Sequence, residues 1–247
     1  MIGTKMVRFS ALVLSVSIGL TATADNALSQ PTVQSKKECR LGLFLQSKNQ
    51  WRKSIPYFDR AIKLDPTDAW SLCRRAQAKR ECEDVAGALV DVNKAIALDP
   101  KKSEFYFQQS RIYSDLQKTD LAIQSLGKGI ALHDNAVGWW FYSDRSHLLI
   151  IKGDYTGGLN DLCQAVRLSP KEAGIRFDRA VLYFRSGRYK DAVDDLTVAY
   201  ASKTTNDRNR ILQLRAQCYD KLGKTDLAAA DRKQCNAGAL DEWGPPP

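Results

Sequence analysis

The sequence predicts an all-α fold, in which antiparallel helix pairs stack on one another as a solenoid. Three columns of small residues predict it, because each column keeps spacings of 34, 34, 36, 34 and 36 residues. Small residues at matched points of two helices let the helix axes approach to roughly 8 Å. A single helix pair cannot bury its apolar face alone, so neighbouring pairs must stack. The columns are Gly42, Ala76, Ser110, Ser146, Ala180 and Ala216; Ser54, Ala88, Ala122, Gly158, Ala192 and Ala228; and Ala61, Ala95, Gly129, Ala165, Ala199 and Cys235.

The composition agrees with a globular chain. Its 247 residues are 44% hydrophobic and 26% charged, which excludes a wholly disordered or collagen-like protein. Lysine and arginine number 37 against 28 aspartates and glutamates, a formal charge of +9. With two histidines and no Cys/His cluster at zinc spacing, we expect no metal site.

Residues 1–24 have the three parts of a secretory signal peptide. Lys5 and Arg8 precede a mainly apolar run from Phe9 to Leu20, and a small-x-small motif ends at Ala24. Twelve residues are too few for a membrane anchor, which needs about 20. We therefore expect cleavage near Ala24 and export to the periplasm or the medium, with a mature chain of charge +7 and no integral membrane span.

The columns divide the mature chain into six units of two helices each. A short extension, 25–34, precedes them, and a tail, 243–247, follows. Each unit has two helical stretches of about 14 residues, separated by a turn such as that at Gly153 or Gly187, and proline ends the second helix at Pro66, Pro100 and Pro170. The expected units are 35–68, 69–102, 103–138, 139–172, 173–208 and 209–242.

These units resemble the tetratricopeptide repeat family. The fourth unit matches the family pattern best, with Tyr142, Ser146, Gly158, Leu162, Ala165 and Pro170 at the expected positions. The third and fifth units lack the closing proline, and the sixth has Arg232 where a large apolar residue is usual. The resemblance implies a right-handed superhelix that acts as a non-enzymatic protein-interaction scaffold.

The resemblance also implies where a partner binds. In this family the second, fifth, ninth and twelfth residues of each repeat form a concave groove. Aromatic side chains there supply contact area at low entropic cost, and arginine binds carboxylates or backbone carbonyls. The predicted partner-binding residues are Trp70, Gln77, Arg80, Phe107, Arg111, Trp140, Ser143, His147 and Phe177. The carboxylate clamp by which some relatives bind acidic chaperone tails is not matched, since Cys39 and Leu43 occupy its first two positions.

The sequence contains no motif of a known enzyme class. His147 follows Ser143 on one predicted helix, but an isolated pair of this kind is more typical of polar scaffold positions than of nucleophilic catalysis. No phosphate-binding loop, dinucleotide fingerprint or zinc-protease motif is present. We interpret Asp194 and Asp195 as a solvated carboxylate pair, and we expect no catalytic residue and no cofactor.

Six cysteines in an exported chain suggest disulfides. Cys39 and Cys73 occupy equivalent positions in adjacent units and lie too far apart to bridge, as do Cys73 and Cys82 on one helix. Cys218 and Cys235 belong to the two helices of the last pair, and they are the candidate disulfide.

Taken together, these features predict a scaffold or adaptor of the bacterial cell envelope that binds a peptide or protein segment in its groove. The alternative is a binder of an anionic envelope polymer or membrane surface, which would use the basic charge. Nucleic-acid binding is prompted by the run 74–80 (RRAQAKR), but export argues against it. The sequence leaves the oligomeric state open.

Overall fold

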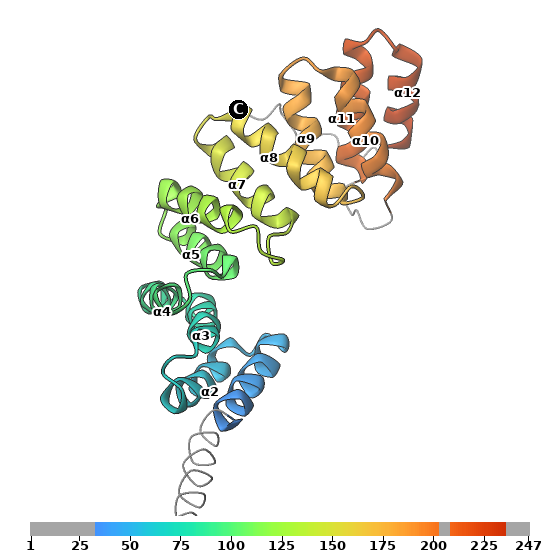
Figure 1. The fold of residues 1–247 in the computed structure, drawn as a ribbon. Coiled ribbons are helices and arrows are strands. Elements are labelled where there is room, and N and C mark those ends of the chain that lie inside the picture. The colour runs from blue at the N-terminus through green and yellow to red at the C-terminus, as the bar shows by residue number, and fades with distance from the viewer. Residues whose placement is uncertain (1–32, 203–207, 236–247) are drawn as a thin grey trace, which may run out of the picture. The chain divides into compact units, whose positions relative to one another are not determined.

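The computed structural model describes residues 33–202 and 208–235, which form helices joined by short turns, with no strand among them (Figure 1). The predicted signal peptide and the tail after residue 242 lie outside these ranges. The chain divides into two compact units between Leu116 and Gln117. We call them unit 1 and unit 2.

Unit 1 begins with a helix over residues 33–47 and continues with α2 (Trp51–Leu64), α3 (Ala69–Glu81), α4 (Val85–Leu98) and α5 (Ser103–Asp115). In this unit α3 packs against both α2 and α4, and α5 packs against α4. Each helix therefore contacts the one before it, as expected for stacked hairpins.

Unit 2 continues the same alternation of first and second helices. Its helices are α6 (Thr119–Ala131), α7 (Trp139–Ile151), α8 (Tyr155–Leu168), α9 (Ala173–Arg185), α10 (Tyr189–Ala201), α11 (Arg208–Lys221) and α12 (Thr225–Gln234). Successive helices from α6 to α12 pack against one another. The six-unit helical pattern expected from the sequence is thus present in the described ranges.

The small columns lie where the two helices of a hairpin cross. Ala76 and Ala88 are fully buried in unit 1, as are Ala180 and Ala192 in unit 2. At Gly158, a Cβ atom would approach Ile150 Cγ1 to 2.9 Å, so this crossing has no room for a larger residue. The columns therefore mark close helix approaches, as the sequence predicts.

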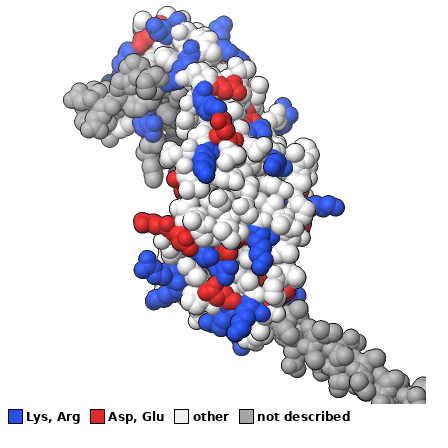
Figure 2. Space-filling view, turned by 90° about the vertical axis from the view of Figure 1, so that its left-hand side faces the viewer, with Lys and Arg blue, Asp and Glu red and all other residues white. Residues whose placement is uncertain are grey.

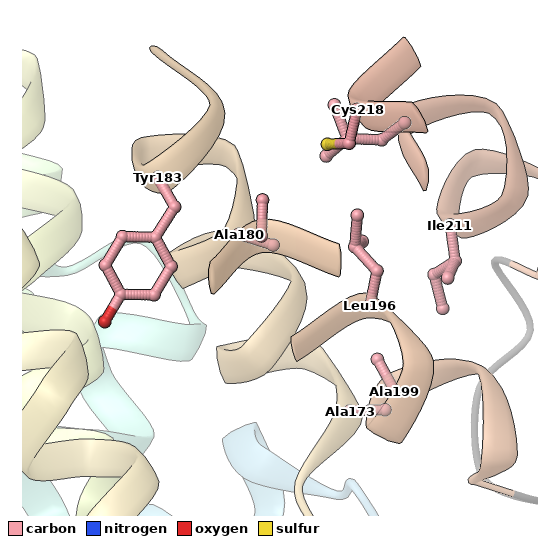
Figure 3. Packing of buried hydrophobic residues seen from close by; sticks show 9 residues of the cluster. Ala173, Ala180, Tyr183, Leu196, Ala199, Ile211 and Cys218 are labelled. Atoms are coloured by element: carbon pink, nitrogen blue, oxygen red, sulfur yellow. The ribbon is translucent and has the colours of Figure 1, made fainter. Parts of the chain in front are cut away.

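Apolar residues between hairpins complete each core. In unit 2, Leu196 of α10 lies between Ala180 of α9 and Ile211 of α11, and all three are at most 1% exposed (Figure 3). Burying a leucine of this kind contributes about 1.5–3 kcal/mol. Stacking of one hairpin on the next is thus the main apolar stabilisation in this part of the chain.

A buried ion pair recurs in four of the helix pairs. Arginine on the first helix donates two hydrogen bonds of 2.6–2.7 Å to an aspartate sixteen residues later on the second helix. The aspartates are 2–5% exposed, so each carboxylate depends on its arginine for compensation. The pairs are Arg75–Asp91, Arg145–Asp161, Arg179–Asp195 and Arg215–Asp231.

The expectation of a solvated pair at Asp194 and Asp195 is therefore wrong for Asp195. Its side chain is 3% exposed and also accepts a hydrogen bond of 2.6 Å from Arg176. Asp195 lies three residues after Ala192, on the side of α10 that faces α9, whereas Asp194 is exposed. The carboxylates of these adjacent residues thus have different environments, since that of Asp195 is buried and that of Asp194 faces solvent.

The candidate disulfide between Cys218 and Cys235 is also wrong, because both cysteines are free thiols. The Cys235 thiol lies 3.4 Å from the backbone carbonyl of Asn209, near the start of α11. Cys218 lies nine residues further along that helix, or about 13 Å of helical rise, which is beyond bridging distance. Burial raises the pKa of the Cys218 thiol to about 12, which keeps it protonated at neutral pH.

Candidate partner-binding site

The predicted groove residues of unit 1 lie on α3 and α5, around an exposed tryptophan. Trp70 is 41% exposed, and its ring stands edge-on to the buried Phe105, with centroids 5.2 Å apart. The Arg74 guanidinium lies 5.5 Å from the Trp70 ring centroid and donates to Gln77 Oε1 at 3.1 Å. Trp70 therefore offers an aromatic face that its neighbours already hold in place.

Next to this tryptophan, unit 1 has a cavity of about 350 Å³. It brings together the predicted groove positions of the first two repeats, Lys36, Cys39 and Trp70. The two carboxylates of the cavity already accept hydrogen bonds from neighbouring residues, because Asp68 caps the N-terminus of α3 and Asp65 accepts from Thr67. The other lining residues are Ser35 and Arg40.

The two predicted groove arginines of unit 1 differ in availability. The Arg80 side chain is 10% exposed and pairs with Glu81 and, at 3.3 Å, with Asp115. Its Nε atom is buried without a hydrogen-bond partner. Arg111 is half-buried on α5 next to Phe107, and no carboxylate of the described residues lies within 4.0 Å of it. Arg111 is therefore the better placed of the two to bind an incoming acceptor.

In unit 2 the predicted anchor is Trp140, in the first turn of α7. It is 40% exposed and stands edge-on to Trp139, with centroids 6.1 Å apart. A Cβ atom on Gly138 would lie 2.2 Å from the Trp140 ring, so the ring rests against a backbone that has no side chain. Gly138 thus sets the position of this exposed ring.

Two further predicted residues of α7 have different surroundings. Ser143 is 6% exposed, so it offers little contact area to a partner. The His147 side chain is 53% exposed and lies 3.1 Å from the Asp178 carboxylate of α9. This hydrogen bond raises the pKa of His147, against an opposing effect of partial burial. The pair links the first helices of two adjacent repeats.

Phe177 of α9 is half-buried against the core of unit 2. The guanidinium of Arg210 on α11 lies 5.1 Å from its ring centroid. Arg210 is the second residue of the sixth repeat, so the family pattern places it in the groove. It was nevertheless not among the predicted partner-binding residues. Sequence reasoning also missed Arg74, which follows Trp70 by four residues and therefore shares its helix face.

Charge is mixed rather than segregated on the face that Figure 2 shows. On the face shown in Figure 2, lysine and arginine side chains lie beside aspartate and glutamate side chains, with uncharged surface between the groups. Ion pairs such as Arg60–Glu38 and Arg188–Asp191 also join basic and acidic side chains along the described helices. The net positive charge of the sequence is therefore not gathered into one basic patch on this face.

The described residues contain no group of three or more His, Cys, Asp or Glu side chains arranged to hold a metal ion. Within the same ranges, no helix combines the length and the apolar character needed to cross a bilayer.

The fold and the exposed first-helix aromatics define a helical-repeat protein of the kind that binds other proteins. Family models described as tetratricopeptide repeat match residues 39–68, 103–133 and 144–207, about half of the chain. The chain belongs to the tetratricopeptide repeat family. Such repeats are typically non-catalytic scaffolds that mediate protein–protein interactions.

Curated relatives are longer and distant. Tetratricopeptide repeat protein 13 of Homo sapiens is 23% identical over 68% of this chain and 20% of its own length. DnaJ homolog subfamily C member 3 of Homo sapiens is 24% identical over 81% of this chain and 42% of its own length. The chain thus spans between a fifth and about two fifths of these relatives.

Solved structures share the fold. PilF of Pseudomonas aeruginosa has a TM-score of 0.73 at 14% identity, covering 86% of this chain and 95% of its own. PilW, described as a type IV pilus biogenesis factor, has a TM-score of 0.66 at 14% identity over 81% and 91%. YrrB, described as a TPR protein with an unusual peptide-binding site, has a TM-score of 0.62 at 16% identity over 72% and 89%. At these identities the likeness concerns the fold alone.

Proposed function

We propose that this protein is an exported scaffold or adaptor of the bacterial cell envelope that binds a peptide or protein segment along its first helices. The observation that carries the proposal is the pair of exposed tryptophans at the second position of two repeats, Trp70 and Trp140. Each is about 40% exposed, yet each ring is held by neighbouring groups. A rigid, exposed aromatic ring is the kind of residue that dominates binding energy in interfaces.

The predicted first-helix surface has a different chemistry in each unit. In unit 1 the aromatic ring is combined with Arg74 and Arg111, whereas in unit 2 it is combined with His147 and Phe177. Arginine suits carboxylates and backbone carbonyls, and the aromatic rings of unit 2 suit apolar side chains. The alternative function, binding of an anionic polymer or membrane surface, receives less support because the charges in Figure 2 are interspersed.

A peptide-display selection tests the binding proposal without knowledge of the natural partner. Random twelve-residue peptides displayed on phage are selected on the mature protein, and the enriched peptides are then tested on a Trp140→Ala variant. The proposal predicts enriched peptides with apolar anchors that lose affinity for the variant. If nothing enriches, or if enriched peptides bind the variant equally, the first-helix surface is not the binding site.

Salt dependence distinguishes the two functions. Binding through aromatic anchors changes little between 50 and 500 mM salt, whereas charge-driven binding to an anionic surface weakens steeply. Export is tested separately, by N-terminal sequencing of the protein recovered from the periplasm. A mature chain that starts near Asp25 supports export, and a retained Met1 in a cytoplasmic fraction contradicts it.

A further inference from the structure

The helix over residues 33–47, the first that the structure describes, has an exposed apolar stripe that is covered in the first helices of the later described repeats. In α3, α5, α7, α9 and α11, one face packs against the second helix of the preceding repeat. The helix over residues 33–47 has no such preceding helix among the described residues. Its corresponding stripe contains Leu41 and Phe44, which are 40% and 59% exposed.

The repeat register shows that these positions normally belong to a helix–helix interface. The residues that correspond to Phe44 in the second, third, fifth and sixth repeats are at most 5% exposed: Ala78, Ile112, Leu182 and Cys218. Phenylalanine is larger than any of them, and no helix within residues 33–202 or 208–235 covers it; the Lys48 ammonium lies 5.9 Å from its ring centroid. The geometry of the other repeats therefore specifies an α-helix as the group that fits over Phe44.

The polar residues around the stripe specify the charge of that helix. Lys37 occupies a position that holds a buried residue in the other repeats, for example Phe105 and Ile175, at most 2% exposed. With Lys48 it makes this face basic, and the acidic residue of the helix, Glu38, is already paired with Arg60 at 2.8 Å. If a helix with only apolar residues packed over this face, the Lys37 ammonium would be buried without a counter-charge.

We infer that the face formed by Lys37, Leu41 and Phe44 of the helix over residues 33–47, together with Lys48 of the following turn, binds an amphipathic, acidic α-helix of a partner protein. The partner helix lies where the second helix of a preceding repeat would lie, with apolar side chains over Leu41 and Phe44 and carboxylates near Lys37 and Lys48. A helix in a groove is a common mode of recognition. The site lies on a different face from the tryptophan surface and does not depend on it.

The probe for this site is a lactam-stapled peptide with the sequence of α10, residues 189–201 (YKDAVDDLTVAYA). In the structure this acidic, amphipathic helix packs against the equivalent face of α11. A control peptide has lysine in place of Asp191 and Asp194. Fluorescence anisotropy of the labelled peptides is measured with the mature protein, with Phe44→Asp and with Lys37→Glu. Val90→Asp is the matched control, because Val90 is 67% exposed on α4.

We expect the acidic peptide to bind the wild type, and Phe44→Asp to weaken it at least ten-fold without lowering the melting temperature. Lys37→Glu is expected to shift preference toward the lysine-containing peptide, and Val90→Asp to have no effect. The inference is overturned if the acidic peptide does not bind, or binds Phe44→Asp as it binds wild type. It is also overturned if Phe44 supports dimerisation in sedimentation, or retention on phosphatidylglycerol vesicles, in place of peptide binding. The effect of Trp140→Ala on the phage-selected peptides does not change the outcome expected for the stapled peptide, so each of the two proposals can fail without the other.

Discussion

The hairpins that lie wholly within one unit close with the same backbone turn but with different residues in it. The hairpin of α5 and α6, which crosses the boundary between the units, has Gln117 there, with a φ angle of 58°. In unit 1, Asn49 and Glu83 have φ angles of 56° and 70°, whereas Gly153, Gly187 and Gly223 of unit 2 have φ angles of 83°, 75° and 70°. A left-handed conformation costs a residue with a side chain about 1–2 kcal/mol, but it costs glycine little. Asparagine tolerates this conformation better than most residues. In unit 1, therefore, it is chiefly on Glu83 that packing of the two helices imposes the turn.

The units also differ in their buried ion pairs. Unit 2 has three arginine–aspartate pairs, and unit 1 has one. Both aspartates have two cationic partners, since Asp91 pairs with Arg75 and Lys79, and Asp195 pairs with Arg179 and Arg176. Arg75 has a second carboxylate partner, Asp59, at 2.7 Å, whereas Arg179 has Asp195 alone among the described carboxylates. A buried charge that loses its partner is strongly destabilising. The same repeated pair should thus be more critical in unit 2 than in unit 1.

The largest effect is expected from removing a buried aspartate. Asp195→Ala leaves Arg176 and Arg179 without their shared carboxylate and should lower the free energy of unfolding by about 3 kcal/mol. Asp91→Ala in unit 1 also removes the carboxylate that Lys79 contacts at 2.9 Å, but it should cost less because Arg75 keeps Asp59. Urea unfolding measures both, and the exposed neighbour Asp194→Ala is the control. Equal losses for Asp195→Ala and Asp194→Ala would contradict the buried-pair assignment.

Overpacking a hairpin crossing should have the next largest effect. Ala180 is fully buried between the helices of the fifth repeat, so Ala180→Leu should destabilise the protein by about 1–3 kcal/mol. Ala76→Leu makes the corresponding change in unit 1, where Ala76 is also fully buried. Differential scanning calorimetry is the measurement. A neutral result at both sites would mean that the small columns do not mark the crossings.

The comparison of the turns predicts that two substitutions change the free energy of unfolding in opposite directions. Glu83→Gly relieves the left-handed strain in unit 1 and should stabilise the protein by about 0.5–1 kcal/mol after the entropic cost of glycine. Gly187→Glu introduces that strain in unit 2 and should destabilise it by a similar amount. Urea midpoints of the two variants, with exposed Lys128→Ala as the control, test this. Changes of the same sign would show that local backbone preference does not distinguish the units.

The smallest effect concerns pH. Since Asp178 raises the pKa of His147 in the folded protein, the pair stabilises the fold fully below the ordinary histidine pKa of about 6.5. That stabilisation disappears as pH rises through the raised pKa. It should amount to about 0.3 kcal/mol, because both side chains are partly exposed. Urea midpoints at pH 5.5 and 8.5 should differ less in Asp178→Asn than in wild type, and an unchanged difference would contradict the assignment.

The hairpin architecture could be predicted from the sequence because small residues at fixed spacing have one physical use, the close approach of two helices. The arginine–aspartate pairs could also have been found from the sequence. In four repeats an arginine comes one residue before the small residue of the first helix, as Arg75 does before Ala76, and an aspartate comes three residues after the small residue of the second helix, as Asp91 does after Ala88. Asp195 was instead interpreted together with its neighbour Asp194, although adjacent residues on a helix face different environments.

The candidate site was less predictable. The positions of Trp70 and Trp140 followed from the family pattern, but the sequence did not show that Ser143 is buried or that Arg80 pairs with two carboxylates. Those properties depend on side chains from neighbouring helices. The candidate disulfide failed for a related reason, because membership of one hairpin does not place two cysteines at the same height along it.

The central claim is that exposed first-helix aromatics bind a partner segment rather than support the fold. The most direct test measures both properties of Trp140→Ala, using a peptide selected on the wild-type protein. Phe107→Ala tests the predicted aromatic anchor of the third repeat, in unit 1, and Gly138→Ala displaces the Trp140 ring without removing it. Lys128→Ala is the exposed control.

The account predicts that Trp140→Ala weakens peptide binding about thirty-fold, equivalent to about 2 kcal/mol, while the melting temperature changes little. Gly138→Ala should weaken binding in the same direction. A Trp140→Ala variant that melts at a lower temperature but binds the peptide with wild-type affinity would contradict the account, because Trp140 would then be a packing residue.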